Sequence, residues 1–92
     1  MNMNRSDRLD RLIAEGEQLV PLSRGDVSTG PNLELQDDYV AWRSTCVQLL
    51  RELGPTAGYL LWELESDTRG QQFYRASASR VLGVMKAAQR LV

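Results

Sequence analysis

The sequence predicts an all-α fold, a small antiparallel bundle of about four helices that forms a single domain over residues 1–92. Three observations lead to this prediction. Apolar residues recur at steps of three and four along several segments, which is the period of helices that pack on one side. The most regular segment, residues 37–53, has both a helix start signal and a stop signal. Only one short run has strand character, and a lone strand has no partner to pair with.

The first helix is expected over residues 6–20, where leucine, isoleucine and valine share one face and charged residues lie off it. Asn4 or Ser6 can cap its start, because a short polar side chain accepts a hydrogen bond from the first turn. Pro21 ends it, since proline cannot continue a helix. Gly16 falls on the buried face, so we expect another helix to approach closely there.

The central helix is expected over residues 37–53, after a long connection at residues 21–36. That connection holds two prolines and two glycines and has no periodicity. Asp37 or Asp38 is predicted to cap the helix, and the Gly-Pro pair at 54–55 to close it. Its apolar stripe is wide enough to pack on several neighbours and consists of Tyr39, Val40, Trp42, Cys46, Val47, Leu49, Leu50 and Leu53.

Two residues of this stripe could serve either core packing or a chemical function. Trp42 recurs at helical spacing with leucine and valine, which favours a core position over a stacking platform for bases or a ligand pocket. Cys46 has no basic residue beside it on its face to lower its pKa. We therefore interpret Cys46 as a buried, unreactive thiol.

A short third helix is expected over residues 56–65, with Pro55 suited to its first turn. Leucines occupy one side of this helix, and Tyr59 and Trp62 lie on the other. The continuous apolar run GYLLWELE also has strand character, but no second segment offers a strand to pair with it. Because this element is short, we expect the ring of Trp62 at an edge of the core.

The last helix is expected over residues 71–92, after a polar turn that ends at Gly70. Its apolar stripe runs from Tyr74 to Val92, and the opposite face is basic. No Gly, Pro or polar tail follows Leu91 and Val92, so we expect the chain to be the N-terminal part of a longer protein.

The composition disfavours catalysis and cofactor binding. The sequence has no histidine and one cysteine, which removes the commonest general base, the commonest metal ligand and any internal disulfide. The glycines do not form a phosphate-binding loop. We therefore expect no enzyme activity, no cofactor and no metal. The N-terminal residues lack an apolar leader, and no run approaches the roughly 18 residues needed to cross a bilayer, so we expect a cytoplasmic protein without a membrane partner.

Charge is segregated along the chain. Residues 1–68 carry six arginines and all 12 acidic residues, a net charge of −6, whereas residues 69–92 carry five cations and no acid. This asymmetry indicates a charged protein partner or self-association, with neutralisation inside the fold as the alternative. The predicted basic interaction face comprises Arg69, Arg75, Arg80, Lys86 and Arg90. The predicted acidic face comprises Glu34, Asp37, Asp38, Glu63, Glu65 and Asp67.

Three phrases carry a resemblance to a known group of proteins: LIAEGEQLV at residues 12–20, DDYVAWRSTCVQLLRELGP at residues 37–55 and VLGVMKAAQRLV at residues 81–92. In this order they resemble a small helical module at the N-termini of bacterial anti-phage defence effectors, which precedes TIR-like and other effector domains. The resemblance implies a recruitment or oligomerisation module, related in role to death-fold and CARD-like adaptors, whose partner is a like domain. A death fold has six helices, so the resemblance also raises a six-helix bundle as the alternative fold.

Two other functions are consistent with the sequence. The basic face of the last helix could bind nucleic acid, although the net charge of −1 and the absence of helix-turn-helix spacing disfavour this alternative. The chain could also be a free-standing small regulator that masks a surface of a partner protein.

Overall fold

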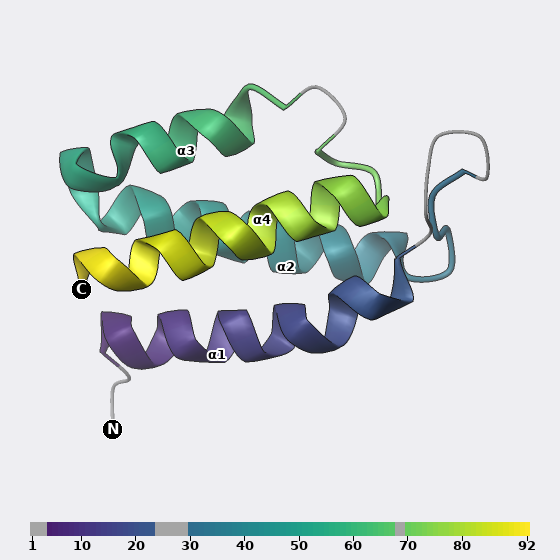
Figure 1. Cartoon of the computed structure of the whole chain (residues 1–92), viewed down its shortest axis with the longest axis horizontal. Coiled ribbons are helices and arrows are strands. Elements are labelled where there is room, and N and C mark those ends of the chain that lie inside the picture. The colour runs from purple at the N-terminus through teal and green to yellow at the C-terminus, as the bar shows by residue number, and fades with distance from the viewer. Residues whose placement is uncertain (1–3, 24–29, 68–69) are drawn as a thin grey trace.

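The computed structural model is an up-and-down bundle of four α-helices, each antiparallel to the one before it (Figure 1). The structure describes residues 4–23, 30–67 and 70–92, and these ranges contain no β-strand. The all-α prediction and the helix count are thus confirmed, and the described residues fit four helices rather than six. The helices are α1 (Arg5–Leu19), α2 (Gln36–Glu52), α3 (Gly58–Glu65) and α4 (Arg75–Ala88).

The start, the end and the glycine of α1 follow the sequence signals. Asn4 Oδ1 accepts a hydrogen bond from the Asp7 backbone N–H at 2.8 Å, so Asn4 is the cap. After Leu19 the chain tightens into a short 3-10 helix, Val20–Leu22, which contains the proline. A Cβ atom added to Gly16 would lie less than 3.0 Å from Trp42 Cζ2. The close approach of another helix at Gly16 is therefore confirmed, and that helix is α2.

The predicted cap of α2 is wrong. The helix begins at residue 36, one residue earlier than expected, and Asp37 and Asp38 lie inside its first turn. There the carboxylates suit the positive end of the helix dipole without capping it. The preceding turn is held by Asn32, whose Oδ1 accepts hydrogen bonds from the backbone N–H groups of Glu34 at 3.1 Å and Leu35 at 3.3 Å.

The connection between α2 and α3 is tighter than predicted. Gly54 has φ of 80°, in the left-handed region that glycine adopts without strain, and it closes α2 as expected. A 3-10 helix, Gly54–Ala57, then includes Pro55. Because this turn uses residues 56 and 57, α3 starts at Gly58 and is only eight residues long.

The predicted start of the last helix is also wrong, since α4 begins at Arg75 rather than at residue 71. Phe73 is fully buried, and its backbone N–H donates to Gln36 Oε1 at 2.9 Å. Its carbonyl accepts from the Asn32 N–H at 3.2 Å. These long-range bonds hold the chain extended through Tyr74 and delay the helix. After α4 the chain ends in a 3-10 helix, Gln89–Leu91.

The core lies between all four helices and is centred on α2. Trp42 is 6% exposed, and its Nε1 donates to the Leu12 carbonyl on α1 at 2.9 Å, which confirms its predicted core position. Tyr39 stacks on Phe73 with ring centroids 4.9 Å apart. Cys46 is fully buried, as predicted. The remaining large buried side chains are Leu9, Leu12, Ile13, Val47, Leu49, Leu50, Leu60, Leu64, Val81, Val84 and Met85.

Candidate functional site

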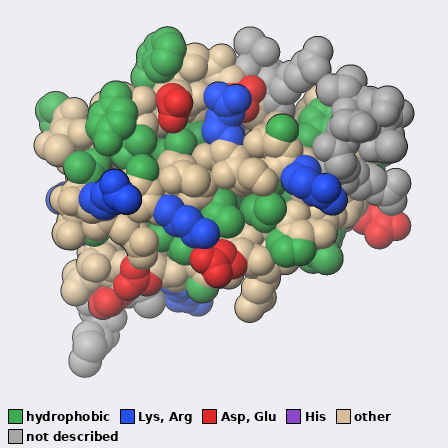
Figure 2. Space-filling model, viewed as in Figure 1, with side chains coloured by type: hydrophobic (Ala, Val, Ile, Leu, Met, Phe, Trp, Pro, Cys, Tyr) green, Lys and Arg blue, Asp and Glu red, His purple; other side chains and the backbone are tan. Residues whose placement is uncertain are grey.

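The basic face predicted from the sequence lies along α4 and the turn that follows it. Arg75, Arg80, Lys86 and Arg90 are all exposed, and cationic side chains cross the viewed face of the molecule (Figure 2). The opposite side of α4 packs into the core through Ala78, Val81, Met85 and Ala88. At 1.5 Å per residue, the cations extend over about 22 Å. Arg69, the fifth predicted member, lies outside the described residues.

These cations differ in their partners. Arg80 Nε lies 3.7 Å from Asp67 Oδ2, and Lys86 Nζ lies 3.5 Å from Glu17 Oε1. In the described part of the chain, no carboxylate lies within 4.0 Å of Arg75 or Arg90. Internal neutralisation, the alternative to a charged partner, therefore applies to Arg80 and Lys86 but not to the other two.

The predicted acidic residues form two groups. Glu34, Asp37 and Asp38 are exposed at the start of α2, and the carboxylates Glu63, Glu65 and Asp67 lie at the end of α3 and just beyond it. The start of α2 lies at the end of the bundle where α4 also begins, whereas α3 ends near the middle of the bundle (Figure 1). Glu65 lies beside Arg51 near the end of α2, so the acidic residues form two separate groups along the bundle.

The two acidic groups differ in how they are paired. Glu65 Oε1 accepts from Arg51 Nη2 at 2.8 Å, and Asp67 contacts Arg80. None of the described cations lies within 4.0 Å of Glu34, Asp37 or Asp38. All three carboxylates at the start of α2 thus lack a described ion pair, whereas in the other group only Glu63 does.

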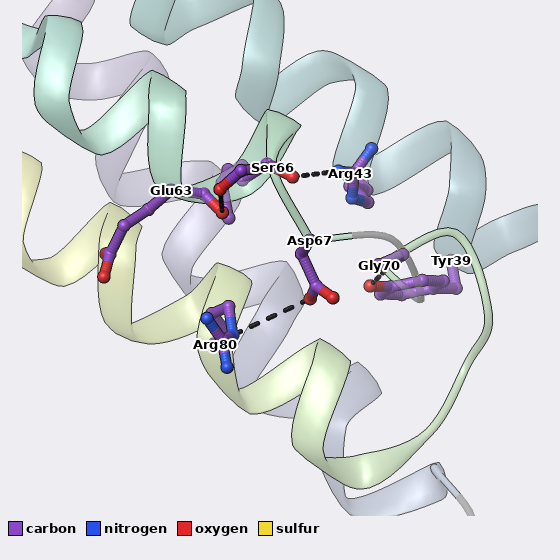
Figure 3. A network of polar contacts seen from close by, with 8 residues as sticks. Tyr39, Arg43, Glu63, Ser66, Asp67, Gly70 and Arg80 are labelled. Atoms are coloured by element: carbon purple, nitrogen blue, oxygen red, sulfur yellow. Dashed lines mark hydrogen bonds and ion pairs between the residues drawn. The ribbon is translucent and has the colours of Figure 1, made fainter.

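A buried arginine that was not among the predicted site residues joins α2 to the end of α3 (Figure 3). Arg43 on α2 is 6% exposed, and its Nη2 donates to the Leu64 carbonyl at 2.7 Å, while its Nε has no hydrogen-bond partner. Nearby, the Tyr39 hydroxyl donates to the Gly70 carbonyl at 2.5 Å. Arg43 follows Tyr39 by four residues, which puts it on the same buried side of α2. That spacing could have predicted that Arg43 is buried.

The buried titratable groups show no features of a reactive centre. Burial raises the pKa of the Cys46 thiol to about 12, so the reactive thiolate is not populated near neutral pH. Burial likewise raises the pKa of the Tyr39 hydroxyl to about 12, and the Arg43 guanidinium opposes this shift. Within the described ranges, His, Cys, Asp and Glu side chains form no group of three or more that could hold a metal ion.

One hollow, of about 490 Å³, lies beside α2 and the segment that follows α3. Its lining includes Arg43 and Arg51 together with the carboxylates Glu65 and Asp67. Because these carboxylates are paired with Arg51 and Arg80, the hollow offers no adjacent pair of free acids for acid-base work. No helix among the described residues has the length and apolar character to cross a membrane.

Two aromatic side chains on α3 are far more exposed than a core edge requires. Tyr59 is 62% exposed and Trp62 is 68% exposed. We expected the Trp62 ring at an edge of the core, but it lies on the surface, outside the core and outside the half-buried side chains packed against it. Tyr59 and Trp62 are three residues apart, on the side of α3 opposite the buried Leu60 and Leu64. This spacing could have predicted that the two rings lie together on the surface.

Comparison of the chain with protein-family models, with curated proteins and with solved structures finds no match. The features that the structure offers are the α4 cations, the acidic group at the start of α2 and the exposed aromatic pair on α3.

Proposed function

We propose that this chain is a non-enzymatic interaction domain that recruits or oligomerises proteins through complementary charged surfaces. The observation that carries the proposal is the exposure of Arg75 and Arg90 on one face, with no described carboxylate within 4.0 Å of either. Unpaired surface cations steer association toward an oppositely charged partner and contribute little to folding. Such a face is therefore better explained by a partner than by stability.

The best complement to this face within the same chain is the acidic group at the start of α2. Glu34, Asp37 and Asp38 are exposed and have no described cation within 4.0 Å. Glu65 and Asp67, by contrast, already have internal partners. A like domain would thus present its α2 group to the α4 cations of its neighbour, with Glu63 and the paired acids in a secondary role.

This contact joins two different surfaces, so it is heterologous rather than two-fold symmetric. A heterologous contact can repeat from copy to copy and gives rings or open assemblies. Since charge complementarity acts mainly on the rate of association and on specificity, the assembly should weaken as salt is added.

The resemblance to N-terminal modules of bacterial anti-phage defence effectors supplies the biological setting of the proposal. In that setting the domain gathers attached effector domains, or binds a like domain on another defence protein. The reading frame of the gene tests this part. A frame that continues into a TIR-like, protease, nuclease or nucleotide-binding domain supports the effector module. A stop codon directly after Val92 favours a free-standing regulator.

Sedimentation of a charge-reversed variant tests the contact. The double variant Arg75→Glu with Arg90→Glu should keep its helical content and associate several-fold more weakly than the wild type, with little salt dependence. Arg5→Glu with Arg11→Glu is the matched control, because it makes the same change in net charge at exposed positions on α1. If the first variant assembles like the control, the basic face does not carry the contact.

Nucleic acid is a second candidate partner, favoured by the exposed cations along α4. Internal pairing of Arg80 and Lys86 reduces the charge available for phosphates. A mobility-shift titration at low salt distinguishes the two functions. Retardation of DNA or RNA that the Arg75→Glu, Arg90→Glu variant abolishes would support nucleic acid, and no retardation at any concentration would exclude it.

A further inference from the structure

The exposed aromatic pair on α3 has the character of a binding surface. Tyr59 and Trp62 lie three residues apart, so their rings project from the same side of a helix whose other side is buried through Leu60 and Leu64. Single exposed apolar residues are common, but Trp and Tyr dominate the binding energy of protein interfaces. We call Tyr59 and Trp62 the knob.

The knob lies next to the basic face. α3 packs beside α4, and Figure 2 shows exposed hydrophobic side chains over α3 above the cationic side chains over α4. Glu63 is a carboxylate next to Trp62, but the cations of α4 outnumber it on this face. A partner that receives the knob must therefore tolerate or attract positive charge.

A hollow between α1 and α2 has the complementary character. Its volume is about 320 Å³, and we call it the socket. It is walled by apolar groups, with two carboxylates and an amide around them: Leu19, Leu22, Trp42, Glu15, Asp38 and Gln18. Leu22 is 54% exposed, so the apolar wall faces solvent. Asp38 belongs to the acidic group at the start of α2, which makes the surroundings of the socket negative.

We propose that the knob of one copy of this chain inserts into the socket of a second copy. The inference rests on the proposed function and names both the partner and the contact. Insertion would cover Trp62 and the exposed Leu22 while the α4 cations of one copy meet the α2 carboxylates of the other. Apolar contact would then supply the affinity, and the charges the orientation.

Charge selects this pairing over the symmetric ones. A contact between two knobs brings the cations of two α4 helices together, and a contact between two sockets brings the acids of two α2 helices together. Like charges across an interface cost several kcal/mol, whereas the knob-to-socket contact opposes unlike charges. The knob and the socket share no residue, so one copy can engage two neighbours, and the contact propagates without closing a dimer.

Mixing two interface variants tests the pairing. Trp62→Ala removes the larger ring of the knob, and Leu22→Lys puts a cation into the socket wall, opposite the incoming cations. Both positions are exposed, so each variant should stay folded by circular dichroism. Each alone should associate at least about 30-fold more weakly than the wild type in sedimentation experiments. An equimolar mixture should form a one-to-one heterodimer and nothing larger, because one good knob and one good socket remain.

Val92→Ala is the matched control, since Val92 is an apolar side chain of similar exposure, 50%, outside both surfaces. It should assemble like the wild type. If the wild type associates and Trp62→Ala associates equally well, the knob is refuted while the proposed charge-driven function stands. If both variants lose association but their mixture forms no heterodimer, the knob-to-socket pairing is refuted. A wild type that is monomeric at every salt and protein concentration overturns the knob-to-socket pairing and self-association, and leaves only recruitment of a different protein from the proposed function.

Discussion

Adding a single methyl group at Gly16 should destabilise the bundle, because α1 and α2 touch there. A Cβ at this position would lie less than 3.0 Å from Trp42 Cζ2 and 3.0 Å from Leu82 Cδ1. The indole cannot tilt away freely, because Trp42 Nε1 donates at 2.9 Å to the carbonyl of Leu12, which lies on α1 like Gly16. Either α1 moves away from α2 or that hydrogen bond is lost.

The magnitude follows from three contributions to the free energy of unfolding. Overpacking a well-filled core costs about 1–3 kcal/mol. Losing the indole hydrogen bond costs about 1 kcal/mol. Alanine regains about 1 kcal/mol over glycine inside a helix. Gly16→Ala should therefore lower the free energy of unfolding by roughly 1–3 kcal/mol.

Urea unfolding followed by circular dichroism measures this change, and Gly83→Ala is the matched control. Gly83 is exposed inside α4, and a Cβ there would have no atom within 4 Å. The same substitution should raise stability at that position by about 0.5–1 kcal/mol, since only helix propensity acts. The two variants should therefore shift the urea midpoint in opposite directions.

A Gly16→Ala variant as stable as the wild type, or stabilised like Gly83→Ala, would refute the reasoning. It would mean that α1 and α2 are not in close contact at this glycine. The Trp42→Leu background provides a further check. With the indole removed, Gly16→Ala should cost less than it does in the wild type, because the group that it meets is absent.

The remaining predictions concern the core, one cap and alkaline pH. Trp42→Ala should largely unfold the domain at room temperature, because deleting a buried aromatic costs about 3–5 kcal/mol and a domain of this size holds little more. A variant that stays folded by circular dichroism would contradict the core assignment. Asn4→Ala should lower the free energy of unfolding by about 1 kcal/mol in urea titrations, since the Asp7 N–H loses its acceptor, and Asn4→Asp should restore most of it. Folding raises the pKa of Tyr39 from 10.0, and that of Cys46 from 9.0, to about 12. The native state thus favours the neutral forms, so stability should hold below about pH 9 and fall as pH rises toward 12. Tyr39→Phe should make that fall shallower in urea unfolding across the same pH range, and an equally steep fall would contradict the assignment.

The sequence by itself determined the helices whose limits are local. Asn4, Pro21 and Gly54 act on backbone groups within a turn of their own position, so α1 and the end of α2 could be predicted to within a residue or two. The helical period likewise determined that Trp42 and Cys46 are buried. It also placed in solvent the four described cations of α4 and the 3-10 helix after it, which is the part of the candidate site that could be predicted.

Only the tertiary structure decided the features that depend on partners distant in sequence. α4 starts late because Phe73 is bonded to Asn32 and Gln36, some 40 residues earlier in the chain.

The same is true of the surface charges, since an ion pair such as Lys86 with Glu17 depends on how helices meet and not on the spacing within one helix. The packing of the helices therefore determines which α4 cations have no ion pair. It also determines that Trp62 faces solvent beside them.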